Sequence, residues 1–389
     1  MWKFRELSEG EPERSPHEAE FFNVGDLDAS AALVRESIQN SLDARLNFNN
    51  PVHVKFTLGS ESKKKFGPYY SDLLSHVQSC GFKLDSAIKD LFTYLVIEDF
   101  GTRGLDGPIT RTEVSDGQKS NYYNLWWREG ISQKERSDAG RWGLGKTVFF
   151  VCSELRSFWG LTIRQDDQRE LLLGKALLKS HRFDGAQYDY YGYCKGENQP
   201  IDEPPQIERF KRQFHISRNG ESGLSIVLPF PVRDITDHDL IRAVIQHYFY
   251  SIIRGFLTVE VRTNSHSTLL NNKTIFEIAS QINWKGTSWE NHPVPNLLYF
   301  IHNAVNTQES QFITLERFVL PKITEELFGE KLEDARKLFA EGKVVPIRVP
   351  IQITLSDNTI MDSHFHAFIQ KDEELPKVEE FYIRSGISI

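Results

Sequence analysis

Residues 28–58 join a helix to a strand, which restricts the chain to folds that mix α and β structure. The run DASAALVRESIQNSLDARLN has the composition of a helix, with Asp28 or Ser30 available as its N-cap. The next residues, PVHVKFTL, alternate apolar and polar side chains, the period of a strand with one buried face. A helix followed directly by a half-buried strand predicts the α+β class.

The polar face of this helix carries side chains that can bind a ligand. At about 100° per residue, Glu36, Asn40 and Asp43 fall within roughly 60° of one another, whereas Val34 and Ile38 lie on the opposite side. We expect Val34 and Ile38 to pack on a sheet, so that the opposite face presents oxygen atoms to a metal-bound substrate. A helix whose polar face is merely solvated is the alternative.

The pattern along the rest of the chain predicts two α+β domains. An N-terminal arm at 1–27 precedes a first domain at 28–232, and a second domain occupies 233–389. Within the first domain, residues 101–145 are rich in glycine and polar residues and show no sustained period. A long segment of this kind predicts a lid over a site.

Composition narrows the functional classes. The 389 residues carry 46 Lys and Arg against 54 Asp and Glu, a formal net charge of −8, so contact with nucleic acid would need a local basic patch. Cys80, Cys152 and Cys194 form no Cys-x-x-Cys pair, which argues against a disulfide framework or a thiolate metal site and favours a reducing cytoplasm. No run approaches about eighteen apolar residues, so we expect no membrane span.

A second candidate element is the sequence IEDFGTRGLDG at the end of an apolar run of strand length. Asp99 would accept a hydrogen bond from an exocyclic amine, and Gly101 and Gly104 would let the backbone approach a flat ligand closely. A strand-end Asp before a glycine turn also occurs in many unrelated folds. Alone, this element is therefore weak evidence for a binding site, and it becomes informative only together with other elements.

A third element, SDAGRWGLGKTVFF, opens a short helix with glycines. Backbone amides of Gly140, Gly143, Leu144 and Gly145, with Lys146 beside them, would form an anion site at the helix start. The stretch from Gly140 to Thr147 also matches the P-loop pattern G-x-x-x-x-G-K-[ST]. A P-loop must leave a buried strand, whereas the residues before it, GISQKERSDA, are polar, so the context disfavours this alternative.

Taken in order, the three elements resemble the motifs of the GHKL ATPase superfamily, which includes gyrase B, MutL, MORC proteins, histidine kinases and related heat-shock chaperones. The segment ESIQNSLDA resembles its first motif, Asp99-Phe-Gly101 its adenine-binding motif, and GRWGLG its phosphate-binding glycine motif. The layout is most similar to MutL-like and MORC-like members. The strand from Gly223 to Ser225 resembles a fourth motif, with a Leu inserted where the family usually has Gly-Thr.

The resemblance implies a Bergerat-type α/β sandwich that binds ATP and Mg²⁺, followed by a transducer-like second domain. It implies that Glu36 activates water, Asn40 coordinates Mg²⁺ and Asp99 binds the adenine amine. The glycine motif, Lys146, Asp43 and Ser225 would complete the nucleotide site, with Lys146 also assisting catalysis. A lysine of the second domain would reach the γ-phosphate, and the candidates are Lys273, Lys285 and Lys322.

The function expected from this resemblance is an ATP-driven switch. Nucleotide would close the lid and bring two chains together as a homodimer, and hydrolysis would reset the state. Acting through a protein partner such as a nuclease, the switch would serve DNA repair or antiviral defence, with nucleic acid as a further candidate partner. A nucleotide-sensing scaffold that does not hydrolyse ATP is the alternative. A histidine kinase is disfavoured because the arm before Asp28 is too short for a phosphoacceptor hairpin.

Two other features are more simply structural. His364 and His366 would face the same side of a strand, as a metal pair does, but no third ligand is evident and a surface strand is the simpler interpretation. The basic stretch ERFKRQFHISR, with Lys211, Arg212 and Arg218, could contact nucleic acid, although a solvated linker is the simpler interpretation.

Overall fold

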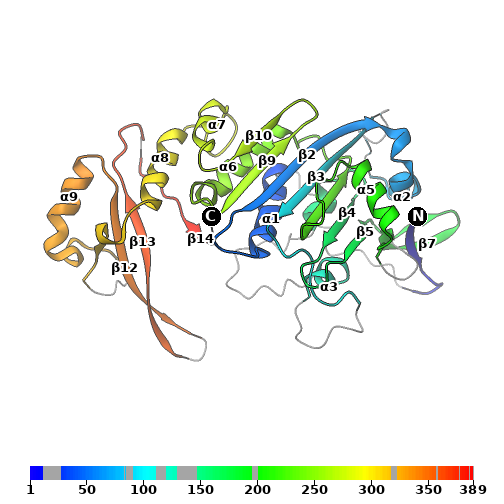
Figure 1. The fold of residues 1–389 in the computed structure, drawn as a ribbon, viewed down its shortest axis with the longest axis horizontal. Coiled ribbons are helices and arrows are strands. Elements are labelled where there is room, and N and C mark those ends of the chain that lie inside the picture. Colours follow the sequence, from blue (N-terminus) through cyan, green and yellow to red (C-terminus); the bar gives the residue numbers. More distant parts are fainter. Residues whose placement is uncertain are drawn as a thin grey trace. The chain divides into compact units, whose positions relative to one another are not determined.

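A computed structural model gives the fold of the chain (Figure 1). It describes residues 1–11, 28–82, 84, 91–110, 120–128, 147–194, 200–316, 322–355, 358–375, 377–384 and 386–388. The contacts between residues divide the chain into two compact units, 1–248 with 255–271, and 249–254 with 272–389. Among the described residues, no helix is long and apolar enough to cross a membrane.

The first unit is built on a mixed sheet of ten strands. The strand order is β1-β7-β5-β4-β8-β3-β2-β9-β10, and β6 pairs with β7. All neighbours are antiparallel except β2 and β9, which run parallel. The strands are β1 (Trp2–Glu6), β2 (Val52–Ser62), β3 (Leu91–Phe100), β4 (Ser157–Ile163), β5 (Glu170–Leu177), β6 (His181–Phe183), β7 (Ala186–Cys194), β8 (Gly223–Pro229), β9 (Leu257–Arg262) and β10 (Ser267–Leu270).

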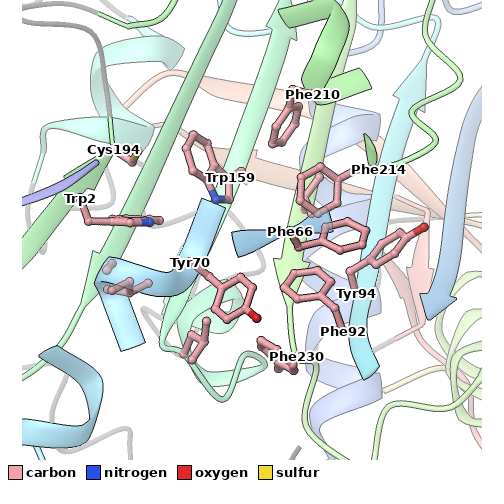
Figure 2. Close-up of a cluster of buried hydrophobic side chains, with 14 of the residues drawn as sticks. Trp2, Phe66, Tyr70, Phe92, Tyr94, Trp159, Cys194, Phe210, Phe214 and Phe230 are labelled. Carbon is pink, nitrogen blue, oxygen red and sulfur yellow. The ribbon is translucent and has the colours of Figure 1, made fainter. Parts of the chain in front are cut away.

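Helices pack on both faces of this sheet. The helices are α1 (Ala29–Asp43), α2 (Gly67–Ser79), α3 (Asn121–Trp126), α4 (Thr147–Val151) and α5 (Pro204–Gln213), with a short 3-10 turn η2 (Lys63–Lys65). Helix α6 (Asp237–Ile253) begins in this unit, and its residues from 249 on belong to the second. On one face, α2 and α5 close an aromatic core over β3, β4, β5 and β8. Figure 2 shows the rings of this core, among which Phe66 and Phe92 stack with centroids 4.2 Å apart.

The position of α1 follows from the alternation of side chains along β3. Phe92, Tyr94 and Val96 belong to the core under α2 and α5, so Glu98 turns to that face and Asp99 to the other. A hydrogen bond from Ser41 of α1 to Asp99 places α1 on this second face. The short helix α4 packs beside α1 there.

Several predicted elements are confirmed. The helix within 28–47 is α1, the strand within 51–58 is part of β2, and the run ending in Asp99 is β3. Val34 and Ile38 have no exposed surface, as expected for the sheet-facing side of α1. In the predicted lid at 101–145, residues 111–119 and 129–145 lie outside the described residues, and the helix α3 occupies part of the remainder.

The N-terminal arm and the predicted boundary after residue 232 differ from what the structure shows. Residues 2–6 of the arm form β1 at the sheet edge, where Trp2 is buried, while 12–27 lie outside the described residues. Strands β9 and β10 lie within the range predicted for the second domain, yet β9 pairs with β2 and extends the large sheet. The pairing joins segments about 200 residues apart, a contact that no local pattern reports.

The second unit is a smaller α+β body. Its sheet has the order β11-β12-β13, with a two-stranded sheet of β14 and β15. Helix α9 and the 3-10 segment η5 supply Ala335 and Leu327 to an apolar core with Ile347 and Val349 of β12. The elements are α7 (Ile275–Gln281), α8 (Val294–Val305), η4 (Glu309–Gln311), β11 (Ile313–Thr314), η5 (Glu325–Lys331), α9 (Leu332–Ala340), β12 (Val345–Thr354), β13 (Ile360–Ile369), β14 (Ile383–Arg384) and β15 (Ile387–Ser388).

Candidate functional site

The polar face of α1 is ordered by hydrogen bonds within the helix. Asp28 caps the helix by accepting a bond from the amide of Ala31 at 2.9 Å. One turn apart, the Asn40 side-chain amide donates to Glu36 Oε1 at 2.9 Å. Because Asn40 is exposed and Glu36 half-buried, this pair is accessible to a ligand. Asp43 is also exposed and accepts a bond from Gln39.

Asp99 is the point where three segments of the sequence meet. Its Oδ1 accepts hydrogen bonds from the Thr102 hydroxyl at 2.6 Å and from the amide of Leu224, on β8, at 2.7 Å. Its Oδ2 accepts a bond from the Ser41 hydroxyl, on α1, at 3.2 Å. The Asp99 side chain retains 12% of its surface, so the carboxylate is fixed by protein donors and remains accessible to one more.

The turn after β3 is fastened to the end of α1. The amide of Leu46 donates to the carbonyl of Gly101, and the amide of Arg103 donates to the carbonyl of Ala44, each at 3.0 Å. Further along, the amide of Leu105 donates to Thr162 Oγ1, on β4, at 2.9 Å. The turn that follows Asp99 is therefore held from both α1 and the sheet.

Two glycines allow this close approach. Gly104 has a φ of 68°, and a Cβ added there would overlap the backbone of β4. Gly223 has a φ of 144°, and its Cβ would lie 2.6 Å from Asp99 Oδ1. Gly104 is therefore glycine for a steric reason. The backbone of Gly223 lies against Asp99, where a side chain would not fit.

Ser225 does not lie where the family resemblance implies. Its hydroxyl accepts a bond from Arg218 and donates to Glu98 Oε1, so it faces the opposite side of the sheet from Asp99. The inserted Leu224 shifts the hydroxyl by one residue, which moves it to the other face of β8. The hydroxyls near Asp99 come from Ser41 and Thr102 instead, two residues that the sequence analysis missed.

A buried ionic centre on that opposite face supports the site from behind. Glu98, which has no exposed surface, accepts bonds from the amides of Ser217 and Arg218 and from the Ser217 hydroxyl. The guanidinium of Arg218 donates to the carbonyls of Asp99, Glu221, Ser222 and Leu224, and lies 3.7 Å from Asp99 Oδ1. Arg218 also packs over the Phe100 ring.

The interpretation of 208–218 as a solvated linker was therefore wrong for most of its length. Its first half lies in α5, where Lys211 is buried and pairs with Glu170 at 2.8 Å. Arg218 is fully buried, and only Arg212 among the three cations is exposed. Glu98 and Asp99 are adjacent acids on a buried strand, so they must face opposite sides of the sheet and each needs hydrogen-bond donors there. This need is the sequence signal that could have indicated a buried arginine.

The glycine motif that was predicted to bind phosphate cannot be placed. Gly140, Gly143, Leu144, Gly145 and Lys146 lie outside the described residues. The chain resumes at α4, where Thr147 is buried, and Cys152 just beyond contacts the carbonyl of Ala29 at the start of α1. The segment after the motif thus lies beside the helix that carries Glu36 and Asn40.

The other candidates lie apart from Asp99 or in the second unit. A cavity of about 420 Å³ at the opposite ends of β2 and β3, lined by Gly59, Tyr94 and Arg233 among others, contains none of the predicted site residues. Lys273, Lys285 and Lys322 belong to the second unit. Across the described ranges, no three His, Cys, Asp or Glu side chains are grouped to hold a metal. His364 and His366 lie on one face of β13, their ring centroids 5.1 Å apart.

Comparison of the sequence with models of known protein families and with curated proteins found no match.

Proposed function

We propose that the chain is a Mg²⁺-dependent ATPase of the GHKL type, with a Bergerat-type nucleotide-binding unit and a transducer-like second unit. The observation that carries the proposal is the set of bonds to Asp99. A carboxylate at the end of a buried strand is held by α1, by its own glycine turn and by the first residues of β8. These are three of the four segments that the sequence resemblance relates to one nucleotide site.

Asp99 has the properties needed to bind adenine. An ionised carboxylate is only an acceptor, so it pairs with the exocyclic amine of adenine and not with the carbonyl that guanine carries at that position. Ser41, Thr102 and Leu224 orient the carboxylate without enclosing it completely. A fixed acceptor of this kind discriminates between bases because the wrong base leaves it unpaired.

The polar face of α1 supplies the groups that would bind the phosphates of the nucleotide and their metal ion. Helix α1 leads from Ser41, at Asp99, back through Asn40 to Glu36, a distance of about 7.5 Å along the axis at 1.5 Å per residue. Because Asn40 donates its amide to Glu36, its carbonyl oxygen is turned toward the other side and suits a hard cation. Bound Mg²⁺ would neutralise phosphate charge during transfer.

Glu36 would then act as the general base. Its carboxylate is oriented by Asn40, one turn along the helix, and a water beside the terminal phosphate would lose its proton to Glu36 Oε2 or Oε1. Nucleotide binding would close the lid and pair two chains, and hydrolysis would reset this state. The cycle would thereby control a partner such as a nuclease in DNA repair or defence. Glu36 favours this function over a scaffold that does not hydrolyse ATP.

The two carboxylates at the end of β3 provide a matched experiment. We expect Asp99→Asn to weaken ATP binding roughly tenfold or more and to reduce the preference for ATP over GTP, because a charged hydrogen bond is lost. Glu98→Gln alters the neighbouring carboxylate on the opposite face, so it should lower thermal stability and leave that preference unchanged. Calorimetric titration of both nucleotides into both variants measures this. Equal base preference in Asp99→Asn and the parent would remove Asp99 from the site.

A further inference from the structure

The strand β13 has a neighbour on one side only, and the direction of its backbone groups can be deduced. The sheet order is β11-β12-β13, and the amide of Leu315 donates to the carbonyl of Arg348. Arg348 therefore directs its backbone toward β11, and so do the residues two positions away on either side. These are Pro346 and Pro350, which have no N–H to offer a neighbouring strand.

Because the register between β12 and β13 is unbroken, the direction of the backbone groups in β13 follows from that in β12. Pro350 lies opposite His364, Arg348 opposite His366 and Pro346 opposite Phe368. Antiparallel residues opposite one another share the same orientation, so these β13 residues point their N–H and C=O groups away from β12. The outward-facing set is Ile360, Asp362, His364, His366 and Phe368.

This outer edge lacks the usual protection against pairing. Edge strands are commonly blocked by proline, lysine or a bulge, and β12 carries two prolines on the side that faces the two-residue strand β11. Strand β13 contains no proline or lysine, and its register with β12 shows no bulge over ten residue pairs. In the described part of the chain, no strand pairs with it on that side.

The side chains of the hairpin are also unusually apolar for an exposed element. Figure 1 shows β12 and β13 extending beyond the cover that α9 and η5 provide. Ile360 is 62% exposed, Met361 50% and Phe365 46%. A ten-residue strand with an open edge and exposed apolar side chains is a template for another strand.

We propose that β13 pairs antiparallel with β13 of a second copy of the chain, about a two-fold axis at His364. This register aligns the outward-facing residues over the whole strand and places Asp362 opposite His366 of the second copy, twice by symmetry. Ile360 lies opposite Phe368 of the second copy in the same register. The strand is thus complementary to itself, with a carboxylate opposite an imidazole and apolar side chains opposite one another, and the two small sheets become one sheet of six strands.

This pairing is independent of the proposed ATPase. It uses only residues of the second unit and needs no nucleotide, so it can be tested in nucleotide-free protein whether or not the chain hydrolyses ATP. The full chain should sediment as a dimer at roughly 100 μM, a concentration that populates a complex of about micromolar affinity. A monomer under these conditions would overturn the proposal.

His364→Pro tests the edge while leaving the hairpin intact. The substitution removes an outward N–H, and Pro350 already occupies the opposite position in β12, so the β12–β13 bonds are kept. We expect the dissociation constant to rise tenfold or more, since each copy loses a backbone bond. Ile353→Ser, on β12, is the control that tests whether the exposed apolar side chains of the hairpin, and not the edge of β13, hold the two copies together. If Ile353→Ser dissolved the dimer and His364→Pro did not, association would proceed through that face and not through the edge.

A charge exchange tests the register. Asp362→Lys should weaken the dimer because it removes the carboxylate opposite His366 of the second copy. The double variant Asp362→Lys, His366→Asp should restore it, because it places a carboxylate opposite a nitrogen donor again. Circular dichroism on each variant verifies that the hairpin is folded. Failure of the double variant to recover while remaining folded would overturn the register at His364.

Discussion

Replacing Arg218 by methionine tests whether the buried ionic centre holds the candidate site together. The Arg218 side chain has no exposed surface and donates to four backbone carbonyls and to the Ser225 hydroxyl. Burial lowers the pKa of its guanidinium, whereas Asp99 and Glu98 raise it, in that order of effect. Methionine retains the packing over Phe100 and removes the charge together with all five bonds.

The expected cost follows from the two carboxylates left behind. Removing one partner of a buried ion pair costs about 3 to 5 kcal/mol, because the remaining charge is uncompensated. We expect Arg218→Met to lower the free energy of unfolding by about this amount. Arg212→Met, at an exposed position six residues earlier, should change it by less than about 0.5 kcal/mol.

Urea unfolding followed by tryptophan fluorescence measures both variants. The double variant Glu98→Gln, Arg218→Met should be less destabilised than the sum of the two single variants, because the charges compensate one another in the parent. A loss below about 1 kcal/mol for Arg218→Met, or strict additivity in the double variant, would refute the role of Arg218 as the counter-ion.

Three further predictions concern catalysis, metal binding and pH. Glu36→Gln should retain ATP binding while the rate of hydrolysis falls roughly a hundredfold. Arg35→Gln, on the same helix, is the control and should keep the parental rate. A parental rate for Glu36→Gln in a phosphate-release assay would exclude Glu36 as the base. Asn40→Ala should abolish the Mg²⁺ dependence of nucleotide binding and Thr147→Val should keep it; Mg²⁺ titrations with the opposite pattern would favour the P-loop alternative. Burial and the neighbouring His181 lower the pKa of His76 to about 4, so the unfolded chain binds more protons below about pH 6.5. Stability should then fall as the pH drops from about 6.5 to 4, and thermal unfolding of His76→Gln should show a smaller slope in that window.

Local patterns predicted those elements whose formation depends on local sequence. The sequence limited the N-cap of α1 to Asp28 or Ser30, of which the structure shows Asp28, and its spacing predicted the buried face with Val34 and Ile38. The end of β3 was predicted for the same reason, since a strand-length apolar run stops at Asp99. These features depend on residues within one or two turns of one another, and such signals are present in the printed sequence.

What the sequence could not predict depends on contacts between distant segments. Strand β1 forms only because β7, almost 190 residues later, offers an edge. Arg218 looked like a surface cation because its partners, Glu98 and Asp99, lie about 120 residues away. Ser225 was assigned to the wrong face because the residue pattern does not state which way the first residue of β8 points.

The parallel pairing of β2 with β9 has a consequence for the order in which the protein is made. Two hundred residues separate the end of β2 at Ser62 from the end of β9 at Arg262. At about 5 to 20 residues per second, the ribosome needs roughly 10 to 40 s to deliver β9 after β2 has been synthesised. Through that interval β2 carries an unsatisfied edge on a partly built sheet, so the nascent chain should depend on chaperones until residue 262 emerges. Stalled chains that end before and after residue 262 should differ in protease resistance. Equal resistance would mean that the sheet is already stable before β9 is added.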